Sequence, residues 1–148
     1  MDDLQQLETW AAPLLAKLES SQRRALARTI GVSLRRSQTQ RIRSQQNPDG
    51  SAYAPRKRDK AGAIKRQRDR MFQRITTARH FQVKADERGV AVGFLGRVAR
   101  IALVHQEGRT DRVAPGGPSI RYDRRELLGF TSAEREAIRD LLVEHLTK

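Results

Sequence analysis

The sequence has no cysteine, few aromatic residues and no long hydrophobic run. Without cysteine the chain cannot form disulfides, thiolate metal sites or a cysteine nucleophile. Hydrophobic residues make up 37% of the 148 residues and aromatic residues 5%, so we expect a modest core. No apolar run approaches the roughly 20 residues of a membrane span, and the start at Asp2 and Asp3 is acidic where a signal peptide is basic. We therefore expect one soluble domain over residues 1–148, with no membrane partner.

Acidic residues are scarce in the middle of the chain. The net charge is +13, and residues 21–79 carry 17 basic against three acidic side chains, a balance of +14 that accounts for the whole excess. Arginine outnumbers lysine there by 14 to 3. This preference favours planar, multi-donor contacts with phosphate or carboxylate groups over simple solubility.

An amphipathic helix is predicted over residues 3–19. Its apolar stripe has helical spacing and consists of Leu4, Leu7, Ala11, Leu14, Leu15 and Leu18. Pro13 either kinks this helix or lies in the first turn of a second piece. Trp10 is a core residue or an exposed anchor, and we expect it in the core because lone tryptophans are usually largely buried.

A second, longer helix is predicted from Ser20 or Ser21 to about residue 45. Its apolar face is narrow and consists of Ala25, Leu26, Ile30, Leu34 and Ile42. Arginines spread around the remaining circumference: Arg23, Arg24, Arg28, Arg35, Arg36, Arg41 and Arg43. We expect one side of this helix to pack on the domain and the others to face solvent or a partner.

Residues 46–57 specify a sharp turn after this helix. Asn47 is biased away from helical geometry by Pro48, which also fixes the first corner, and Gly50 supplies a left-handed position. Tyr53 follows in an extended stretch that can hold its ring against a neighbouring surface. The plainest interpretation is an interhelical turn stapled by a tyrosine.

A strongly basic segment follows at about residues 55–70. It has almost no apolar face and is predicted to be a mobile arm. Its candidate residues for contact with a partner or with DNA are Arg56, Lys57, Arg58, Lys60, Lys65, Arg66, Arg68 and Arg70. Such an arm would bind nucleic acid without sequence preference, although it lacks aromatic residues for base stacking. The same charge suits an acidic protein surface, and charge alone supports the two partners equally.

The second half of the chain is predicted to contain short strands and two helices. Met71, Phe72 and Ile75 share a helical face, and alternation then predicts a β-hairpin over residues 81–94. Residues 97–106 fit a helix or a strand, and a helix is favoured because Gly108 resembles a C-cap.

The C-terminal third is predicted to hold a loop, a third strand and a final helix. Residues 109–118 are rich in glycine and proline and are predicted to be a loop, whose length suggests function or disorder. Ile120 and Tyr122 begin a third strand that continues toward Leu127 and Leu128. A capping box over residues 131–134 then starts an amphipathic C-terminal helix. The fold class is therefore α+β: N-terminal helices, a small antiparallel sheet with a β-hairpin, and a C-terminal helix packed on the sheet.

Catalytic and metal-binding patterns are missing from the sequence. His80, His105 and His145 lie on different predicted elements, without the spacing of a zinc-binding pair. No nucleophile elbow, phosphate-binding loop or calcium loop is present. We therefore predict a protein that is not an enzyme and uses no cofactor or metal.

Three stretches resemble a known family. They are Arg-Ile-Arg-Ser-Gln-Gln-Asn-Pro-Asp-Gly-Ser-Ala-Tyr-Ala-Pro-Arg-Lys at 41–57, Val-His-Gln-Glu-Gly at 104–108 and Arg-Arg-Glu-Leu-Leu-Gly-Phe at 124–130. In their order and spacing they resemble the virion morphogenesis, or tail completion, family of contractile-tailed phages and prophages. The motif positions are Asn47, Pro48, Asp49, Gly50, Tyr53, Pro55, His105, Gln106, Gly108, Leu127, Leu128 and Gly129. The resemblance brings no catalytic residues and implies an architectural role for these positions.

The resemblance also implies a function and partners. It implies a structural protein, made in the host cytoplasm, that completes the tail and makes it competent to join the head. It further implies a homo-oligomeric ring at the tail end or neck of the virion, in contact with the tail tube or tail terminator and with the head connector. We expect the arm to line the DNA channel or dock on an adjoining ring, and residues 109–118 to reach a neighbour. The alternative function is sequence-independent nucleic-acid binding through the arm.

Overall fold

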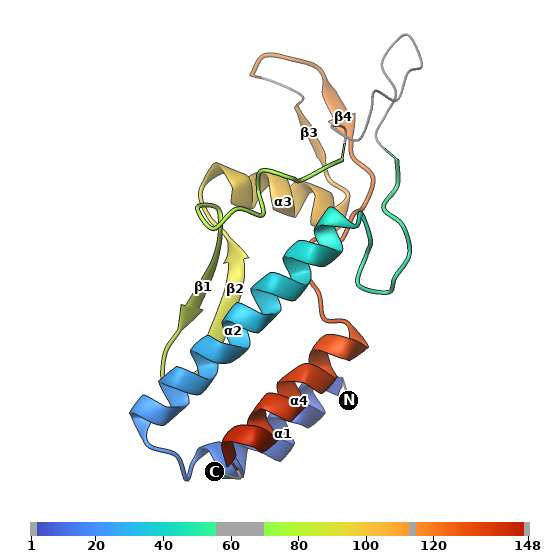
Figure 1. Ribbon diagram of the computed structural model, residues 1–148. Coiled ribbons are helices and arrows are strands. Elements are labelled where there is room, and N and C mark those ends of the chain that lie inside the picture. The colour runs from blue at the N-terminus through green and yellow to red at the C-terminus, as the bar shows by residue number, and fades with distance from the viewer. Residues whose placement is uncertain (1–2, 56–69, 113–114, 147–148) are drawn as a thin grey trace. The chain divides into compact units, whose positions relative to one another are not determined.

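The fold consists of helices at both ends of the chain and short strands between them. The computed structural model describes residues 3–55, 70–112 and 115–146 (Figure 1). Its helices are α1 (Asp3–Leu15), α2 (Ser20–Arg43), α3 (Arg97–Glu107) and α4 (Ser132–Leu146). Its strands form two separate antiparallel pairs, β1 (Phe81–Ala85) with β2 (Val90–Phe94) and β3 (Thr110–Arg112) with β4 (Ser119–Arg121). The predicted α+β class is confirmed, with two small sheets in place of one.

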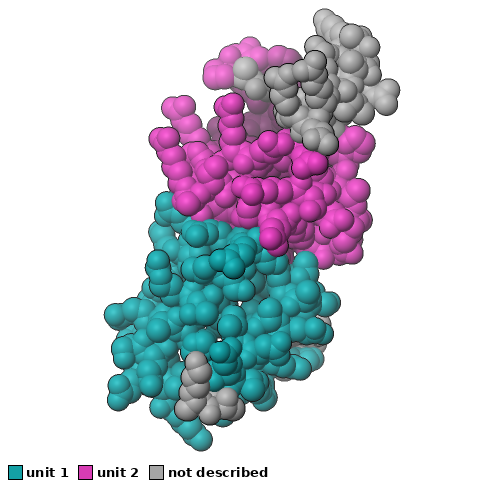
Figure 2. All heavy atoms as spheres, viewed as in Figure 1, with its two compact units in different colours: residues 1–37, 82–92, 130–148 teal, residues 38–81, 93–129 magenta. Residues whose placement is uncertain are grey.

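The chain divides into two compact units (Figure 2). Unit 1 comprises residues 1–37, 82–92 and 130–148, and unit 2 comprises residues 38–81 and 93–129. Helix α2 and the β1–β2 hairpin contribute residues to both units. The expectation of a single domain over the whole chain stays a prediction.

Unit 1 is built on an apolar core shared by three helices. The core residues are Leu7 and Ala11 of α1, Leu26 and Leu34 of α2, and Ile138 and Leu142 of α4. Helices α1 and α4 lie side by side (Figure 1). Burial of a leucine or isoleucine side chain contributes about 1.5–3 kcal/mol, so this cluster is the main source of stability in unit 1.

The β1–β2 hairpin packs directly on the backbone of α2 within unit 1. A Cβ atom placed on Gly31 would lie 2.3 Å from Cγ1 of Val83 and 2.6 Å from Cγ2 of Val90. These distances are too short for any side chain, so glycine is required at this position for the hairpin to approach the helix. The hairpin itself was predicted from alternation, and that prediction is confirmed.

The ends of α3 and α4 follow their sequence signals. Thr131 Oγ1 accepts a hydrogen bond from the Glu134 amide at 3.0 Å, and the Glu134 carboxylate accepts one from the Thr131 amide at 3.1 Å. This is the predicted capping box. Glu134 is only 4% exposed, and its buried carboxylate also accepts a hydrogen bond from the Ser37 hydroxyl at 2.8 Å. Gly108 ends α3 in the left-handed conformation, at φ 66°, as predicted.

Two predictions are wrong: the burial of Trp10 in the core and the helical face at residues 71–75. Trp10 is 42% exposed, because it lies beside the buried stripe marked by Leu7 and Ala11 rather than within it. Residues 71–76 form turns rather than a helix, and Phe72 has a φ of 69°. The Phe72 ring contacts the rings of Tyr53 and His105, so tertiary packing overrides the local helical spacing.

The prediction for residues 109–128 is also corrected. Within the expected loop, residues 110–112 form β3, which pairs with β4 in the register Thr110↔Arg121 and Arg112↔Ser119. The expected third strand ends at Arg121 and does not continue to Leu127 and Leu128. The chain from 122 to 128 has no strand partner within residues 3–55, 70–112 and 115–146. No helix among the described residues is long and apolar enough to cross a membrane.

Candidate functional site

The chain reverses direction in a closed turn directly after α2. Residues 46 and 52 form an isolated antiparallel bridge, and the Asn47 amide donates to the Ser51 carbonyl at 2.8 Å. The Gly50 amide donates to the Asn47 carbonyl at 2.9 Å, and Gly50 has the predicted positive φ of 88°. Asp49 accepts bonds from the amide and hydroxyl of Ser51, and these bonds lower the pKa of the Asp49 carboxyl. The turn is therefore rigidly defined by its own residues.

Arg41 of α2 joins this turn to a distant segment of unit 2. Its guanidinium donates to the carbonyls of Gln46 and Glu126 at 3.0 Å each and to the Leu127 carbonyl at 2.7 Å. Arg41 is 8% exposed, so the earlier expectation that it faces outward is wrong. Its charge is balanced by carbonyl dipoles, and each bond is of the strong, charge-assisted kind.

Two side chains of the turn bind the same segment. Asn47 Oδ1 accepts a bond from the Glu126 amide, and the Tyr53 hydroxyl donates to the Glu126 carbonyl, both at 2.9 Å. Burial raises the pKa of the Tyr53 hydroxyl, although Arg41 opposes the rise. The hydroxyl therefore keeps the proton that it donates.

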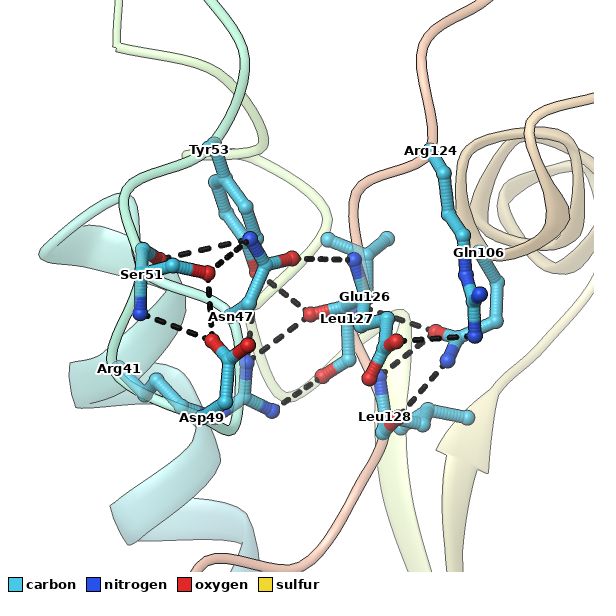
Figure 3. A network of polar contacts seen from close by, with 10 residues as sticks. All are labelled: Arg41, Asn47, Asp49, Ser51, Tyr53, Gln106, Arg124, Glu126, Leu127 and Leu128. Carbon is cyan, nitrogen blue, oxygen red and sulfur yellow. Dashed lines mark hydrogen bonds and ion pairs between the residues drawn. The ribbon is translucent and has the colours of Figure 1, made fainter.

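Gln106 of α3 binds the segment from the other side (Figure 3). Its Oε1 accepts bonds from the amides of Leu127 and Leu128, and its Nε2 donates to the Leu128 carbonyl, all at 2.8 Å. One glutamine thus takes the place of a neighbouring strand. The bound glutamine fixes the segment against the end of α3.

Together these contacts satisfy a stretch of backbone that has no strand partner in the described part of the chain. We call the side chains of Arg41, Asn47, Tyr53 and Gln106, with the segment 126–128 that they bind, the polar network. The Arg125 amide donates to the His105 carbonyl at 2.8 Å, so each amide from 125 to 128 has a partner. Because an unpaired buried backbone group is costly, the network allows Leu127 to be fully buried, at 0% exposure.

Arg125 binds the chain just before residue 56. It is 4% exposed, and its guanidinium donates to the carbonyls of Ala54 at 2.8 Å and Pro55 at 2.9 Å. Its third nitrogen lies 3.3 Å from Nδ1 of His105. Since arginine only donates, Nδ1 of His105 is the acceptor and the proton of the neutral ring is on Nε2.

Gln45 binds the chain just after residue 69. Its side-chain amide donates to the Met71 carbonyl and accepts from the Met71 amide, both at 2.9 Å. Tyr53 and Phe72 also meet edge to face, with ring centroids 5.8 Å apart. Residues 53–55 and 71–72, which flank the basic segment, are therefore both fixed within unit 2.

His105 lies in the middle of a small aromatic cluster. Its ring is 4.8 Å from that of Phe72 and 5.0 Å from that of Tyr122. Burial, and to a smaller extent the charge of Arg125, lower the pKa of His105 to about 4. The histidine is therefore neutral at pH 7 and serves as a hydrogen-bond acceptor.

Two glycines allow close approaches around the network. A Cβ atom on Gly129 would lie 2.6 Å from Cγ of Pro48, and one on Gly108 would lie 3.3 Å from the Arg124 amide nitrogen. The first contact brings together the 47–50 turn and the end of the 124–129 segment. A side chain at 129 would separate them.

Comparison with known proteins identifies the family of the chain. The sequence matches the phage virion morphogenesis family over residues 2–147. The chain belongs to this family. It is also similar to tail completion protein S of Escherichia phage P2, with 33% identity over 153 aligned residues that cover 100% of both chains. No solved structure matches it significantly.

The structure of this family member gathers most of the motif positions in unit 2. The turn, the end of α3 and the 124–129 segment meet there, and the positions in contact are Asn47, Pro48, Tyr53, His105, Gln106, Gly108, Leu127, Leu128 and Gly129. Asp49 and Gly50 hold the turn, and the Pro55 carbonyl is bound by Arg125. The architectural role of these positions stays a prediction.

Of the residues predicted to face a partner, Arg70 lies in the described part of the chain, and its side chain is exposed. The others lie outside the described residues: Arg56, Lys57, Arg58, Lys60, Lys65, Arg66 and Arg68.

Sequence reasoning missed Gln45, Arg41 and Arg125 as site residues. A signal was present for Arg41, since it continues the buried stripe of α2 from Leu34 through Gln38. The described ranges 3–55, 70–112 and 115–146 hold no group of three His, Asp or Glu side chains that could bind a metal.

Proposed function

We propose that this protein completes the phage tail and makes it competent to join the head, acting as a ring of identical subunits at the tail end or neck. The observation that carries the proposal is the similarity to tail completion protein S, which covers the whole of both chains. Its partners in this proposal are copies of itself, the tail tube or tail terminator, and the head connector. The role is structural rather than catalytic, in keeping with the family to which the chain belongs.

A genetic complementation experiment tests the role in tail completion. Cells producing the phage or prophage particle, with this gene deleted, should accumulate heads and tails that do not join. Supplying the wild-type chain should restore joined, infectious particles. Joined particles in the absence of the chain would overturn the proposal.

A second experiment tests the ring. The mass of the purified protein would be measured at low salt and at roughly 0.5 M salt, where the Debye length falls below about 8 Å. A closed oligomer with a single subunit number supports a ring. A chain that stays monomeric both in solution and on isolated tails would overturn it.

The second candidate function is sequence-independent binding of nucleic acid. It is favoured by the charge of unit 2, which carries 19 basic and 7 acidic residues over 38–81 and 93–129. In the same mass measurement, a monomer that binds double-stranded DNA of any sequence at low salt and leaves it at high salt would support this function.

The basic segment can be tested in the complementation experiment. Replacing its Arg and Lys residues with Gln removes eight charges: Arg56, Lys57, Arg58, Lys60, Lys65, Arg66, Arg68 and Arg70. We expect a loss of infectious particles if this segment lines the channel or docks on an adjoining ring. Undiminished infectivity would exclude both roles for the segment.

A further inference from the structure

One side of α2 carries positive charge only. The helix is 24 residues long and contains no Asp or Glu. At about 100° per residue, its outward arginines within unit 1 fall in an arc of about 120°, and they are Arg24, Arg28, Arg35 and Arg36. Within residues 3–55, 70–112 and 115–146, none of the four forms an ion pair with a carboxylate. Surface helices usually mix both signs, so this face suits an acidic partner.

The centre of this face is a regular ridge. Arg28, Val32 and Arg36 are spaced four residues apart and therefore lie along one line of the helix surface. The two arginines are separated by about 12 Å along the axis, at 1.5 Å per residue. Val32 between them is half-buried and offers an apolar contact at the centre.

Helix α4 of the same unit carries a matching ridge of opposite charge. Glu136, Asp140 and Glu144 are exposed and are also spaced four residues apart, so they too span about 12 Å. Val143 beside them is 44% exposed. Arg139, a basic residue, lies at the edge of this face. The acidic ridge is therefore limited to one side of α4.

The two ridges cannot meet within one molecule. Leu26 and Leu34 of α2 share a single core cluster with Ile138 and Leu142 of α4. The exposed face of each helix points away from this shared core, so the basic and the acidic ridge are on different sides of unit 1. In a closed ring each subunit uses two different patches, one toward each neighbour.

We propose that the Arg28–Val32–Arg36 ridge of one copy docks on the Glu136–Asp140–Glu144 ridge of the next copy. This inference rests on the proposed ring and names two faces that join its subunits. The occupant is a second copy because that copy presents charges of the opposite sign at the same spacing, and because ridges of four-residue spacing interdigitate when helices pack. The charged pairs would fix the register, and Val32 and Val143 would supply apolar contact.

Cysteine cross-linking tests the contact, since the wild-type chain has no cysteine. Val32→Cys and Asp140→Cys would be made as separate variants and oxidised on tails and in solution, alone and mixed. We expect disulfide-linked dimers only in the mixture. Dimers within each variant alone would show a symmetric contact and overturn the proposal. Ala12→Cys, exposed on α1, is the control and should give no cross-link with either.

Charge exchange is the second test. Arg28→Glu with Arg36→Glu, and separately Glu136→Arg with Asp140→Arg, should each raise the dissociation constant between subunits at least about tenfold, because like charges then face each other. The chain with all four substitutions should recover assembly. Lys84→Glu with Arg88→Glu makes the same change of charge on the β1–β2 hairpin and should leave assembly unchanged.

The outcomes separate this inference from the proposed ring. Oligomers that are insensitive to both pairs of substitutions, with no mixed cross-link, would leave the ring standing and overturn this interface. A wild-type chain that is monomeric on tails would overturn both. Binding of the α2 face to DNA, lost in Arg28→Glu with Arg36→Glu while subunit assembly persists, would assign that face to nucleic acid instead.

Discussion

The two units of this protein are stabilised by different means. Unit 1 is nearly neutral, with 11 basic and 10 acidic residues, and is organised around one apolar cluster from three helices. Unit 2 carries 19 basic and 7 acidic residues. It also contains most of the buried polar side chains, namely Gln38, Arg41, Thr76 and Arg125. Unit 2 also buries apolar side chains such as Ile42, Phe81 and Leu127. In this basic unit, bonds from long side chains to the backbone thus add to an apolar core.

This difference has an energetic consequence. Apolar contacts in unit 1 are non-directional. Truncating a side chain there therefore lowers the free energy of unfolding by an amount that depends on the volume removed. The hydrogen bonds of the polar network are directional. Each missing donor leaves a buried carbonyl without a partner, at a cost of about 1–3 kcal/mol per group. Unit 2 should therefore be the more sensitive of the two to loss of a single side chain.

The largest effect is expected for Arg41→Met, which keeps most of the side-chain volume and removes the donors. The carbonyls of Gln46, Glu126 and Leu127 lose a bond, so we expect a loss of about 4 kcal/mol. Hydrogen exchange should show faster exchange of the Leu127 and Leu128 amides than of the α4 amides. Arg43→Met, on an exposed arginine of the same helix, is the control and should cost less than about 0.5 kcal/mol. Unchanged exchange at 127 and 128 would contradict the network's role.

Leu26→Ala tests unit 1 in the same way. Leu26 is 2% exposed within the apolar cluster, and truncation of such a leucine costs about 3 kcal/mol. Amide hydrogen exchange should accelerate first in α1 and α4. If the 127 and 128 amides respond as strongly as those helices, the two units unfold as one and the contrast between them fails.

Gly129→Ala should cost about 2 kcal/mol, because the added methyl group would lie 2.6 Å from the Pro48 ring. Urea unfolding measures the change. Gly89→Ala is a matched control, since nothing lies within 4 Å of a Cβ at that position. An equal effect of the two substitutions would show that the Pro48 contact is not close in solution.

The smallest effect is a dependence on pH. Burial lowers the pKa of His105 from 6.5 to about 4, so the unfolded chain takes up a proton in this window and the folded chain does not. Stability should be full above pH 6.5 and fall as the pH drops toward 4, by about 1–2 kcal/mol after allowance for partial exposure. His105→Gln should flatten this part of the curve. A flat wild-type curve between these pH values would refute the prediction.

Local signals in the sequence were sufficient for much of the fold. Alternation located the β1–β2 hairpin, Gly108 marked the end of α3, and the capping box located the start of α4. These features depend on residues that are close in the chain. They could be predicted because the same few residues both carry the signal and form the structure.

Features that depend on distant residues could not be predicted in this way. The burial of Arg41 needs carbonyls 85 and 86 positions away, and the left-handed Phe72 is held by rings from two other segments. Ile120 and Tyr122 predicted a strand toward Leu127 and Leu128, but the strand ends at Arg121 and side chains bind the backbone of 126–128 in place of a partner strand. The family resemblance selected many of the motif residues, yet only the structure shows that they meet.

The way the polar network is assembled sets when the chain can finish folding during its synthesis. Asn47 and Tyr53 lie 79 and 73 positions before Glu126, the residue that they bind. The core of unit 1 likewise needs Ile138 and Leu142. Unit 2 is complete only when residue 129 has left the ribosome, and unit 1 only when α4 has. A truncated chain therefore cannot form all the surfaces of the finished protein.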